Sequence, residues 1–408
     1  MKARRCPSIT TVRKGNKDLI KDLNRFLVLQ HIRQSGKVSR TDIAKATGIG
    51  LSTVTNITEE FLREGLVREV GTAHSTGGRK PVLLQFHERY SYTFGVKVEE
   101  TQLRVALTDL QAEILDVKTV PFEAGSKPEK AVELLSAAIQ VMRQAHGLAE
   151  RQIAGIGIAA SGLINRETGT ILRSSLLGWE NVSICKEVSK RLNGMPVYLD
   201  KNINAYTLAE LTLGSKEKQR HVVIMSIGAG LGLTIVIDGS MYYGSFGGAG
   251  EFGHTIVQMN GYRCHCGQRG CLEMYASEFY LQHAGGELRR QYPHTAVERY
   301  TFSGMEQALK QGDELAARLL REMGTHIGYG LVNVINTLNP KRIVLTGEGM
   351  NYAPHFLPYA LKVAEENFFA AAALPTEIVV SQLGNDAWLQ GAALLVIEQL
   401  FQLPIYQN

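Results

Sequence analysis

The sequence predicts an α/β protein that begins with a winged helix-turn-helix and continues as two similar α/β halves with a cleft between them. Three observations predict this fold. A chain of 408 residues is too long for one ordinary hydrophobic core. Its first 90 residues contain three helical patterns followed by two strand patterns. A strand–turn–strand pattern then occurs twice, within residues 94–108 and 222–238. We expect boundaries that divide the chain into residues 1–87, 88–213 and 214–408.

Charge is distributed unevenly along the chain. Residues 1–90 hold 17 Lys and Arg against 8 Asp and Glu, whereas the remaining residues hold 27 against 31. A basic segment on a slightly acidic body indicates a nucleic-acid module joined to another domain. A solvated basic face would give the same balance, so charge alone does not decide between them. No apolar run is long enough to span a bilayer and no signal peptide is recognisable, so we expect a cytoplasmic protein without membrane insertion.

The N-terminal part begins with a basic segment, residues 1–16, which is either a flexible arm that contacts DNA or a plain disordered tail. Apolar residues at helical spacing predict a first helix over 19–34. Ser39 is placed to cap a second helix that ends at Gly48, with Asp42 at the position for reciprocal capping. A third helix is predicted over 51–64. Two such helices joined at a glycine turn form a helix-turn-helix.

The outward face of the third helix carries short hydroxyl and amide side chains near its start. Such groups suit phosphates and base edges in a major groove. Arg40, at the start of the second helix, is a further candidate contact. A three-helix domain that docks on a protein is the alternative. The candidate DNA-binding residues of the third helix are Ser52, Thr53, Thr55 and Asn56.

Two short strands, 65–70 and 82–86, follow the third helix and enclose a basic, glycine-rich connection. This arrangement predicts a wing. Arg79 or Lys80 at its tip is placed to enter a minor groove, where arginine favours narrow A·T tracts. The basic balance, the helix-turn-helix and the wing together predict binding to double-stranded DNA.

The remaining elements follow the order expected for two α/β halves. In the first half, three consecutive strands precede a long helix, a buried strand, a short strand and another helix. The second half begins with a strand, the glycine turn 228–232 and a second strand, and ends with two strands beside long amphipathic helices. The predicted ranges are 94–98, 103–108, 114–118, 128–146, 153–159, 197–199 and 203–214, then 222–227, 233–238, 342–349 and 377–381.

Three cysteines within eight residues, and a histidine ten residues upstream, form a candidate metal site. Three thiolates and one imidazole are a complete tetrahedral ligand set for zinc. The closed set predicts a structural Zn2+, because no coordination position is left for water. A disulfide or inert buried thiols are the alternatives, but an odd total of five cysteines favours a reducing compartment and a metal. The candidate ligands are His254, Cys264, Cys266 and Cys271.

Two carboxylates, Glu251 and Glu273, bracket the candidate metal site. If a metal holds this loop, the two carboxylates face one another across whatever binds there. Carboxylates beside a metal-fixed loop provide paired hydrogen-bond acceptors that are rigidly held.

The run from Glu251 to His254, together with the run from Cys264 to Glu273, resembles the signature of the ROK family (repressors, open reading frames, sugar kinases). The winged helix, with the sequence 75–81, is similar to that of the family's repressor branch, which includes repressors of xylose and N-acetylglucosamine operons. The resemblance covers nearly the whole chain. It implies a duplicated actin-like or ribonuclease-H-like fold, a sugar in the cleft, and a homodimer or tetramer.

The resemblance also implies roles for individual residues. The family's sugar-contacting carboxylates fall on Glu251 and Glu273, and its histidine that touches both metal and sugar falls on His254. Asn181 lies where the family often places another polar sugar contact, although a plain turn residue explains it equally well.

Two departures from the kinases of the family predict that phosphoryl transfer is lost. Those kinases carry Asp-x-Gly-Gly-Thr in the first hairpin, but here Glu99 and Glu100 replace the two glycines and would crowd and repel a triphosphate. The position of the catalytic base falls on Asn202, whose amide cannot accept the proton of a sugar hydroxyl. Asp200, two residues away, is expected to point elsewhere. Asn202 can still hydrogen-bond a sugar, so sugar binding can persist without catalysis.

These features predict a sugar-responsive transcriptional repressor of carbohydrate-utilisation genes. A dimer would bind two half-sites of a pseudo-palindromic operator. A small sugar or sugar phosphate in the cleft would change the spacing of the winged helices. Three alternatives remain: an active sugar kinase with a DNA-binding arm, a repressor that a protein partner sequesters, and an activator.

Overall fold

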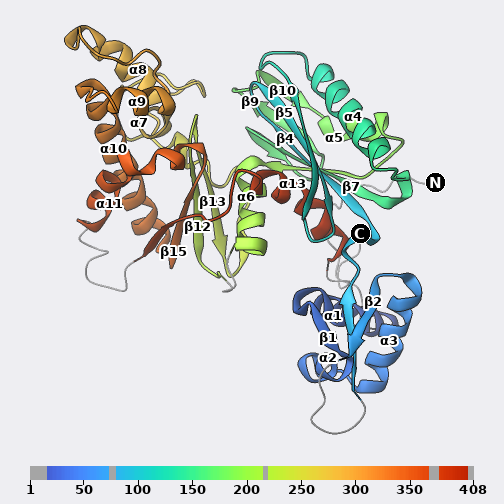
Figure 1. Cartoon of the computed structure of the whole chain (residues 1–408). Helices are drawn as coiled ribbons and strands as arrows, with labels where there is room; N and C mark the ends of the chain where they lie inside the picture. The colour runs from blue at the N-terminus through green and yellow to red at the C-terminus, as the bar shows by residue number, and fades with distance from the viewer. Residues whose placement is uncertain (1–15, 73–79, 215–218, 367–375, 403–408) are drawn as a thin grey trace.

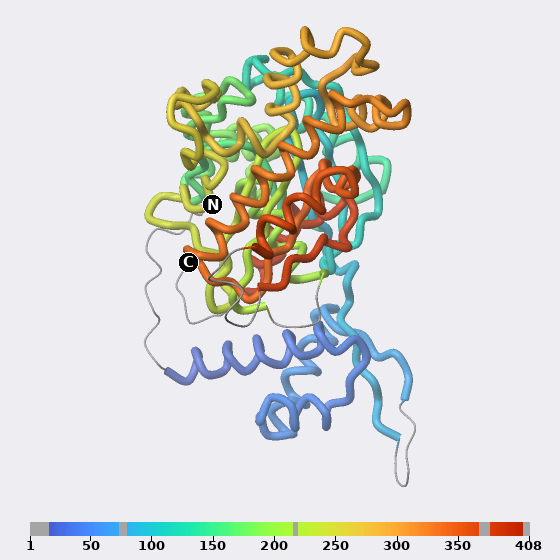
Figure 2. Tube along the Cα trace, turned by 90° about the vertical axis from the view of Figure 1, so that its left-hand side faces the viewer, coloured from blue at the N-terminus to red at the C-terminus, as the bar shows by residue number. Residues whose placement is uncertain are grey.

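The computed structural model describes residues 16–72, 80–214, 219–366 and 376–402. A small N-terminal domain, called the head (residues 16–86), lies at one end of the molecule below two larger lobes (Figure 1). Figure 2 shows helix α1 lying between the rest of the head and the lobes. No helix in the described ranges has the length and apolar character needed to cross a membrane.

The head has the predicted winged helix-turn-helix fold. A three-stranded sheet in the order β1-β3-β2 packs beside three helices. Its elements are α1 (Lys17–Ser35), β1 (Lys37–Ser39), α2 (Arg40–Thr47), α3 (Leu51–Glu64), β2 (Val67–Thr72) and β3 (Val82–Phe86). The wing tip, including Arg79, and the basic arm up to residue 15 lie outside the described residues.

Local sequence signals explain the helix boundaries of the head. The Oγ of Ser39 accepts a hydrogen bond from the Asp42 amide at 3.2 Å, which is the predicted N-cap, and donates one to the Asp42 carboxylate at 2.6 Å. The second bond joins the two side chains, whereas the predicted reciprocal cap would have the carboxylate accept from the Ser39 backbone amide. Gly48 ends α2 in the left-handed conformation, with φ of 70°. On α3, Val54, Ile57 and Phe61 are buried, so the opposite face of this helix is free to meet DNA.

The two lobes repeat one sheet topology, as the sequence predicts. In the first sheet the order is β11-β7-β4-β5-β6, and in the second it is β14-β13-β12-β15-β16. Each sheet has three antiparallel strands followed by two parallel ones. The strands are β4 (Tyr92–Val98), β5 (Gln102–Asp109), β6 (Ile114–Pro121), β7 (Ile153–Ala160), β11 (Val197–Lys201), β12 (Val222–Ile227), β13 (Leu231–Ile237), β14 (Ser240–Met241), β15 (Arg342–Thr346) and β16 (Glu377–Val380).

Helices cover these sheets, and a small sheet that the sequence did not predict extends the first lobe. That sheet consists of β8 (Leu163–Asn165), β9 (Thr170–Ser174) and β10 (Trp179–Val182). The first lobe carries α4 (Pro128–Ala145) and α5 (Ile184–Arg191), α6 (Asn202–Ala209) lies between the lobes and packs on both sheets, and the second lobe carries α7 (Glu273–Ala276), α8 (Glu278–Leu288), α9 (Phe302–Leu309), α10 (Glu314–Leu338) and α11 (Leu357–Glu365).

The last helix, α13 (Ala387–Leu400), returns to the first lobe and packs on β4, β7 and α6. The packing is backbone to backbone: a Cβ atom at Gly391 would lie 1.8 Å from the carbonyl oxygen of Ala205. The predicted assignment of all of 214–408 to the second lobe is therefore wrong for this helix. The physical reason is that α13 is apolar on every side, so it has to be buried between elements.

The far end of α13 meets the head. The ring of Phe401, just after the helix, lies 5.8 Å from that of Phe86 in an edge-to-face arrangement. The guanidinium of Arg33 on α1 lies 4.2 Å from the centre of the same Phe401 ring. The first turn of the helix, which contains Trp388, lies between the two lobes. One rigid element thus joins the space between the lobes to the head.

Candidate functional site

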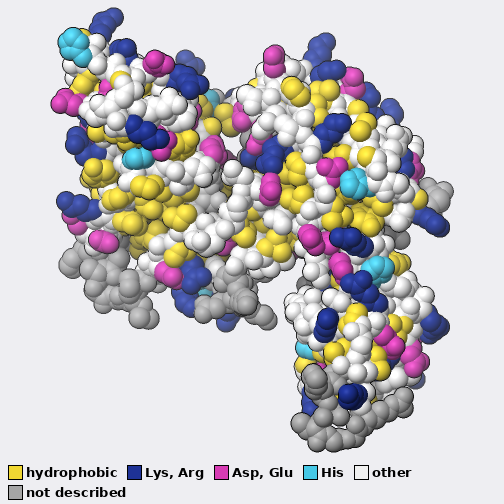
Figure 3. Space-filling view, viewed as in Figure 1, with side chains coloured by type: hydrophobic (Ala, Val, Ile, Leu, Met, Phe, Trp, Pro, Cys, Tyr) yellow, Lys and Arg dark blue, Asp and Glu magenta, His cyan; other side chains and the backbone are white. Residues whose placement is uncertain are grey.

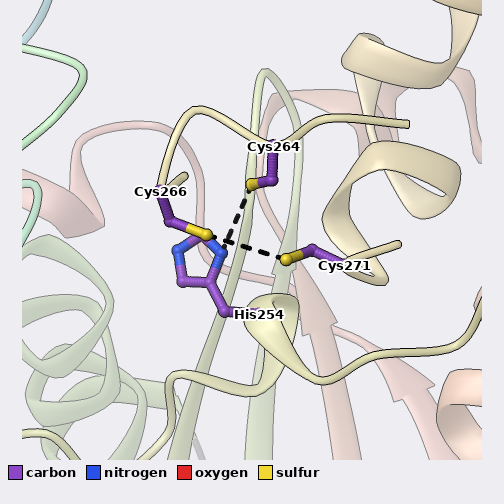
Figure 4. Close-up of side chains that lie close together, drawn as sticks. All are labelled: His254, Cys264, Cys266 and Cys271. Atoms are coloured by element: carbon purple, nitrogen blue, oxygen red, sulfur yellow. Dashed lines mark hydrogen bonds between the residues drawn. The ribbon is translucent and has the colours of Figure 1, made fainter. Parts of the chain in front are cut away.

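The predicted metal ligands converge on one point, as Figure 4 shows. Their four ligand atoms all lie within 4.8 Å of one another. The Sγ atoms of Cys266 and Cys271 are 3.7 Å apart, and Nδ1 of His254 lies 3.6 Å from Sγ of Cys264. Zinc–sulfur bonds of about 2.3 Å at tetrahedral angles give sulfur–sulfur distances of about 3.8 Å. The cluster therefore could hold a metal ion of that size.

Glycines shape the loop that carries the sulfurs. Gly267 and Gly270 adopt positive φ angles of 100° and 78°. A Cβ atom at Gly270 would lie 1.7 Å from the carbonyl oxygen of Gln258, so only glycine fits there. Within the described residues, no disulfide joins Cys264, Cys266 and Cys271. Burial raises the pKa of the Cys271 thiol to about 11, so a metal has to displace its proton on binding.

A cavity of about 420 Å³ lies between the lobes, next to the metal cluster. Figure 3 shows the surface hollowed between them. Both lobes and the start of α13 contribute side chains. Those used below are Lys97, Glu99, Glu100, Arg104, Ser175, Lys201, Asn202, Glu251, His254, His265, Glu273, Glu348 and Trp388.

His254 joins the cluster to the cavity. It lies at the end of the short helical turn Phe252–His254, which packs beside β13. While its Nδ1 faces Cys264, its Nε2 lies 4.0 Å from a carboxylate oxygen of Glu251. A metal bound at Nδ1 would fix both the ring orientation and the direction in which Nε2 faces the cavity.

Glu273 is held rigidly on the cavity wall although only 5% of its surface is exposed. One carboxylate oxygen accepts a hydrogen bond from the Leu231 amide at 3.0 Å, and the other lies 2.5 Å from Nε2 of His265. Burial alone would raise the pKa of Glu273, but the hydrogen bonds from His265 and Leu231 lower it overall. The carboxylate is therefore ionised and available as an acceptor.

His265 is a cavity residue that the sequence analysis missed. Its Nδ1 lies 2.7 Å from the hydroxyl of Ser175, which belongs to the first lobe. The contact therefore crosses the cavity from the first lobe to the cysteine-rich loop of the second lobe. A histidine between two cysteine ligands was the available signal, but its partner is 90 residues away in the chain.

Lys201 makes a second contact across the cavity. Its Nζ donates to the carbonyl oxygen of Ala249 at 2.7 Å and to Glu251 at 3.0 Å, and only 5% of the residue is exposed. The neighbouring Asn202 lines the cavity, and its contact with a sugar stays a prediction. Asp200 is buried and turned toward Asn204 and Arg166, with contacts of 2.7 and 2.8 Å.

Asn181 lies apart from the other predicted sugar contacts. It is exposed on β10 in a left-handed conformation, with φ of 52°, and does not line the cavity. This conformation is typical of a turn asparagine. A contact between Asn181 and an effector stays a prediction.

The predicted DNA-binding residues lie on the head but are not equally available. Ser52, Thr53 and Asn56 are exposed near the start of α3, and Lys80 is exposed at the base of the wing. The hydroxyl of Thr55 donates to the Leu51 carbonyl at 2.8 Å. Arg40 is half-buried and its guanidinium contacts Thr58 at 3.1 Å and Glu69 at 3.4 Å. In this structure Arg40 therefore braces α2 against α3 and β2.

The fold and the site together define a DNA-binding protein with a duplicated α/β body. That body contains a polar cavity and, beside it, a cysteine-rich loop that could hold a metal ion. Residues 93–399 match the model of the ROK family, and residues 21–68 match a winged helix-turn-helix DNA-binding model. The chain belongs to the ROK family.

Named relatives include both regulators and kinases. The xylose repressor of Caldicellulosiruptor bescii is 32% identical over 96% of this chain and 100% of its own length. The DNA-binding transcriptional dual regulator NagC of Escherichia coli is 29% identical over 82% of each chain. A crystal structure of a ROK family transcriptional regulator, a homologue of the E. coli MLC protein, has a TM-score of 0.80 and 27% identity over 94% of this chain and 97% of its own.

A ROK family glucokinase from Streptomyces griseus, solved with glucose and AMPPNP, has a TM-score of 0.65 and 27% identity. It covers 75% of this chain and 99% of its own. The shared part is therefore the body, and the head is the addition that the regulators carry.

Proposed function

We propose that this protein is a sugar-responsive transcriptional repressor of carbohydrate-utilisation genes that binds its effector without phosphorylating it. One observation carries the proposal. The same chain combines α3, a helix whose exposed face can read DNA, with a polar cavity beside a cysteine-rich loop that could hold a metal ion. The similarity to a xylose repressor along the full length supports it.

The cavity offers hydroxyl-binding groups of the right kind. Glu251 and Glu273 present acceptors along one wall, His254 would present a donor at Nε2 when Nδ1 holds a metal, and the amide of Asn202 adds a neutral partner. Rigid placement matters because every disordered polar group would have to be fixed when the sugar binds. A zinc ion held by the His254 and cysteine cluster would fix His254 and the loop that leads to Glu273.

Two features oppose phosphoryl transfer. Glu99 and Glu100 stand on the cavity wall where the family's kinases have glycines, so a triphosphate would meet negative charge. Asn202 stands at the position of the base, and the nearby Asp200 is buried away from the cavity. A coupled assay of ADP release with a panel of hexoses and pentoses tests this. Release above the no-sugar rate would make the chain an enzyme.

The winged helix-turn-helix of the head also suits binding of DNA by a dimer. Two copies of α3 would enter successive major grooves of an operator with two half-sites. Sugar binding between the lobes would shift α13, whose far end contacts the head through Phe401. A coupling of about 1–3 kcal/mol would change operator affinity by roughly 5- to 150-fold.

Replacing Asn56 by Ala tests the DNA-reading face. Asn56 is exposed on α3 and its amide can pair with a base edge, so its loss should weaken operator binding about 5- to 150-fold. Fluorescence anisotropy with an operator duplex selected from a random pool measures the effect. Gln144→Ala, which removes an exposed amide from α4 in the first lobe, is the control and should bind normally. Equal binding by both variants would remove α3 from the interface.

Replacing Glu251 by Gln tests the effector site. The change keeps the size of the side chain but removes the charge that pairs with Lys201 and accepts from a sugar hydroxyl. Sugar affinity measured by calorimetry should fall about 10-fold or more, because a charge-assisted hydrogen bond contributes about 1.5–3 kcal/mol. Operator affinity without sugar should stay unchanged, as in the distant control Glu133→Gln on α4. A normal sugar response would place the effector elsewhere.

A further inference from the structure

The charges that line the cavity are mostly negative. Among the described residues of its wall, three cations face five carboxylates. The cations are Lys97, Arg104 and Lys201, and the carboxylates are Glu99, Glu100, Glu251, Glu273 and Glu348. Such a wall disfavours a ligand that brings further negative charge, unless some cation is free to meet it.

Each of the three cations is already engaged. Lys97 lies 2.6 Å from Glu99, and Lys201 lies 3.0 Å from Glu251. Arg104 pairs with Asp386 at 2.9 Å, just before α13. A phosphate that entered the cavity would have to displace a carboxylate from one of these pairs.

The glycine-rich turn 228–232 is a further place on the described cavity wall where an anion could bind. Successive backbone N–H groups in such a turn form a cradle for phosphate. Here, however, the amide of Ala229 donates at 2.7 Å to a carboxylate oxygen of Glu348. A Cβ atom at Gly228 would lie 2.2–2.6 Å from that carboxylate group, so the side chain rests directly on the turn.

Glu348 comes from the segment after β15, more than a hundred residues from this turn. The pKa of Glu278 is raised, first by burial and in addition by the nearby negative charge of Glu348. The turn is therefore occupied by a negative group of the chain itself.

We propose that the effector is an uncharged sugar, and that the carboxylate of Glu348 occupies the site that the phosphate group of a sugar phosphate would need. This inference rests on the proposed function, because it names the chemical class of ligand for the same cavity. Neutral hydroxyl groups can bind the carboxylates of the wall as donors. A terminal phosphate would meet Glu348 at the turn and Glu99 and Glu100 on the hairpin, and close like charges cost several kcal/mol.

Matched pairs of ligands test the proposal. D-glucose and N-acetyl-D-glucosamine are titrated into the full-length protein by calorimetry, each beside its 6-phosphate ester, and D-xylose is titrated beside its 1-phosphate ester because esterification at its terminal O5 would prevent the pyranose ring. The neutral member that binds best should bind at least about 10-fold more tightly than its ester. Tighter binding of any ester than of its neutral sugar would overturn the inference and leave the proposed repressor function intact.

Variants of Glu348 test its role without knowledge of the sugar. Inorganic pyrophosphate serves as the probe, with wild type, Glu348→Ala, Glu348→Gln and the distant control Glu133→Ala. We expect pyrophosphate to bind both Glu348 variants at least about 10-fold more tightly than wild type or the control. Glu348→Gln keeps an oxygen that can accept from Ala229, so it preserves the fold if Glu348→Ala does not.

The outcomes separate the two ideas. Wild-type protein that binds pyrophosphate as tightly as the Glu348 variants would show that the turn is not blocked, and the inference would fall. Failure of every sugar and every ester to bind would instead count against the proposed effector site, while the pyrophosphate series still decides the role of Glu348.

Discussion

Replacing Cys271 by Ser should remove the metal and disable effector binding together. Cys271 is completely buried and its sulfur lies 3.7 Å from that of Cys266, so a serine hydroxyl would leave the ligand set incomplete. Zinc content should fall from about one ion per chain to nearly none. Sugar affinity should fall roughly 10- to 150-fold, because loss of a hydrogen bond to a charged group costs about 1.5–3 kcal/mol.

The physical reason is that the candidate metal cluster and the cavity share one residue. His254 faces Cys264 through Nδ1 and the cavity through Nε2, and Glu273 follows Cys271 by two residues. Elemental analysis and calorimetry on the same preparation give the two readings. Cys185→Ser is the matched control, since Cys185 is buried in the first lobe outside the cluster. Normal sugar binding by a zinc-free Cys271 variant would show that the metal is incidental.

Replacing Gly391 by Ala should destabilise the whole body. The added Cβ would lie 1.8 Å from the carbonyl oxygen of Ala205, and backbone cannot yield as a flexible side chain does. The helices α13 and α6 would have to separate. Overpacking of this kind costs about 1–3 kcal/mol, and the backbone contact places Gly391 at the upper end. Urea-induced unfolding, followed by circular dichroism, measures the change.

Gly286→Ala supplies the matched control within the second lobe. Gly286 also lies inside a helix, α8, but a Cβ there meets nothing within 4 Å. The higher helix propensity of alanine should make that variant neutral or more stable by up to about 1 kcal/mol. If Gly391→Ala gains stability in the same way, the close crossing of α13 and α6 is not what holds the lobes together.

The head was predictable because its signals are local. Ser39 and Asp42 are three residues apart and cap the same helix, and Gly48 ends it through its own backbone freedom. Both sheets were likewise visible, since each begins with consecutive strands joined by short turns. The cluster of one histidine and three cysteines that could hold a metal was predictable because the loop between Cys264 and Cys271 has a chemistry that few other functions require.

Other features depend on contacts between distant segments, which periodicity does not reveal. The return of α13 to the first lobe is specified by close contacts of Gly391, far along the chain from Ala205. Ser175, His265 and Glu348 reach the cavity through the packing of both lobes. Arg40 was predicted to bind DNA from its position and charge, but its contacts with Thr58 and Glu69 arise from the fold of the head.

The central claim is that a sugar in the cavity changes how the head binds DNA, without chemistry on the sugar. The structure offers one continuous route for this, from Trp388 on the cavity wall along α13 to Phe401 against Arg33 and Phe86. A rigid helix that touches both sites can respond to closure of the lobes as a unit.

The most direct test titrates a selected operator duplex with full-length protein in the presence of ATP, with and without the best-binding neutral sugar. Fluorescence anisotropy measures the operator affinity, and ADP is measured in the same samples. The account predicts a loss of operator affinity of at least about 5-fold and no ADP above background. Unchanged operator affinity with sugar bound, or ADP formed in proportion to the sugar, would contradict it.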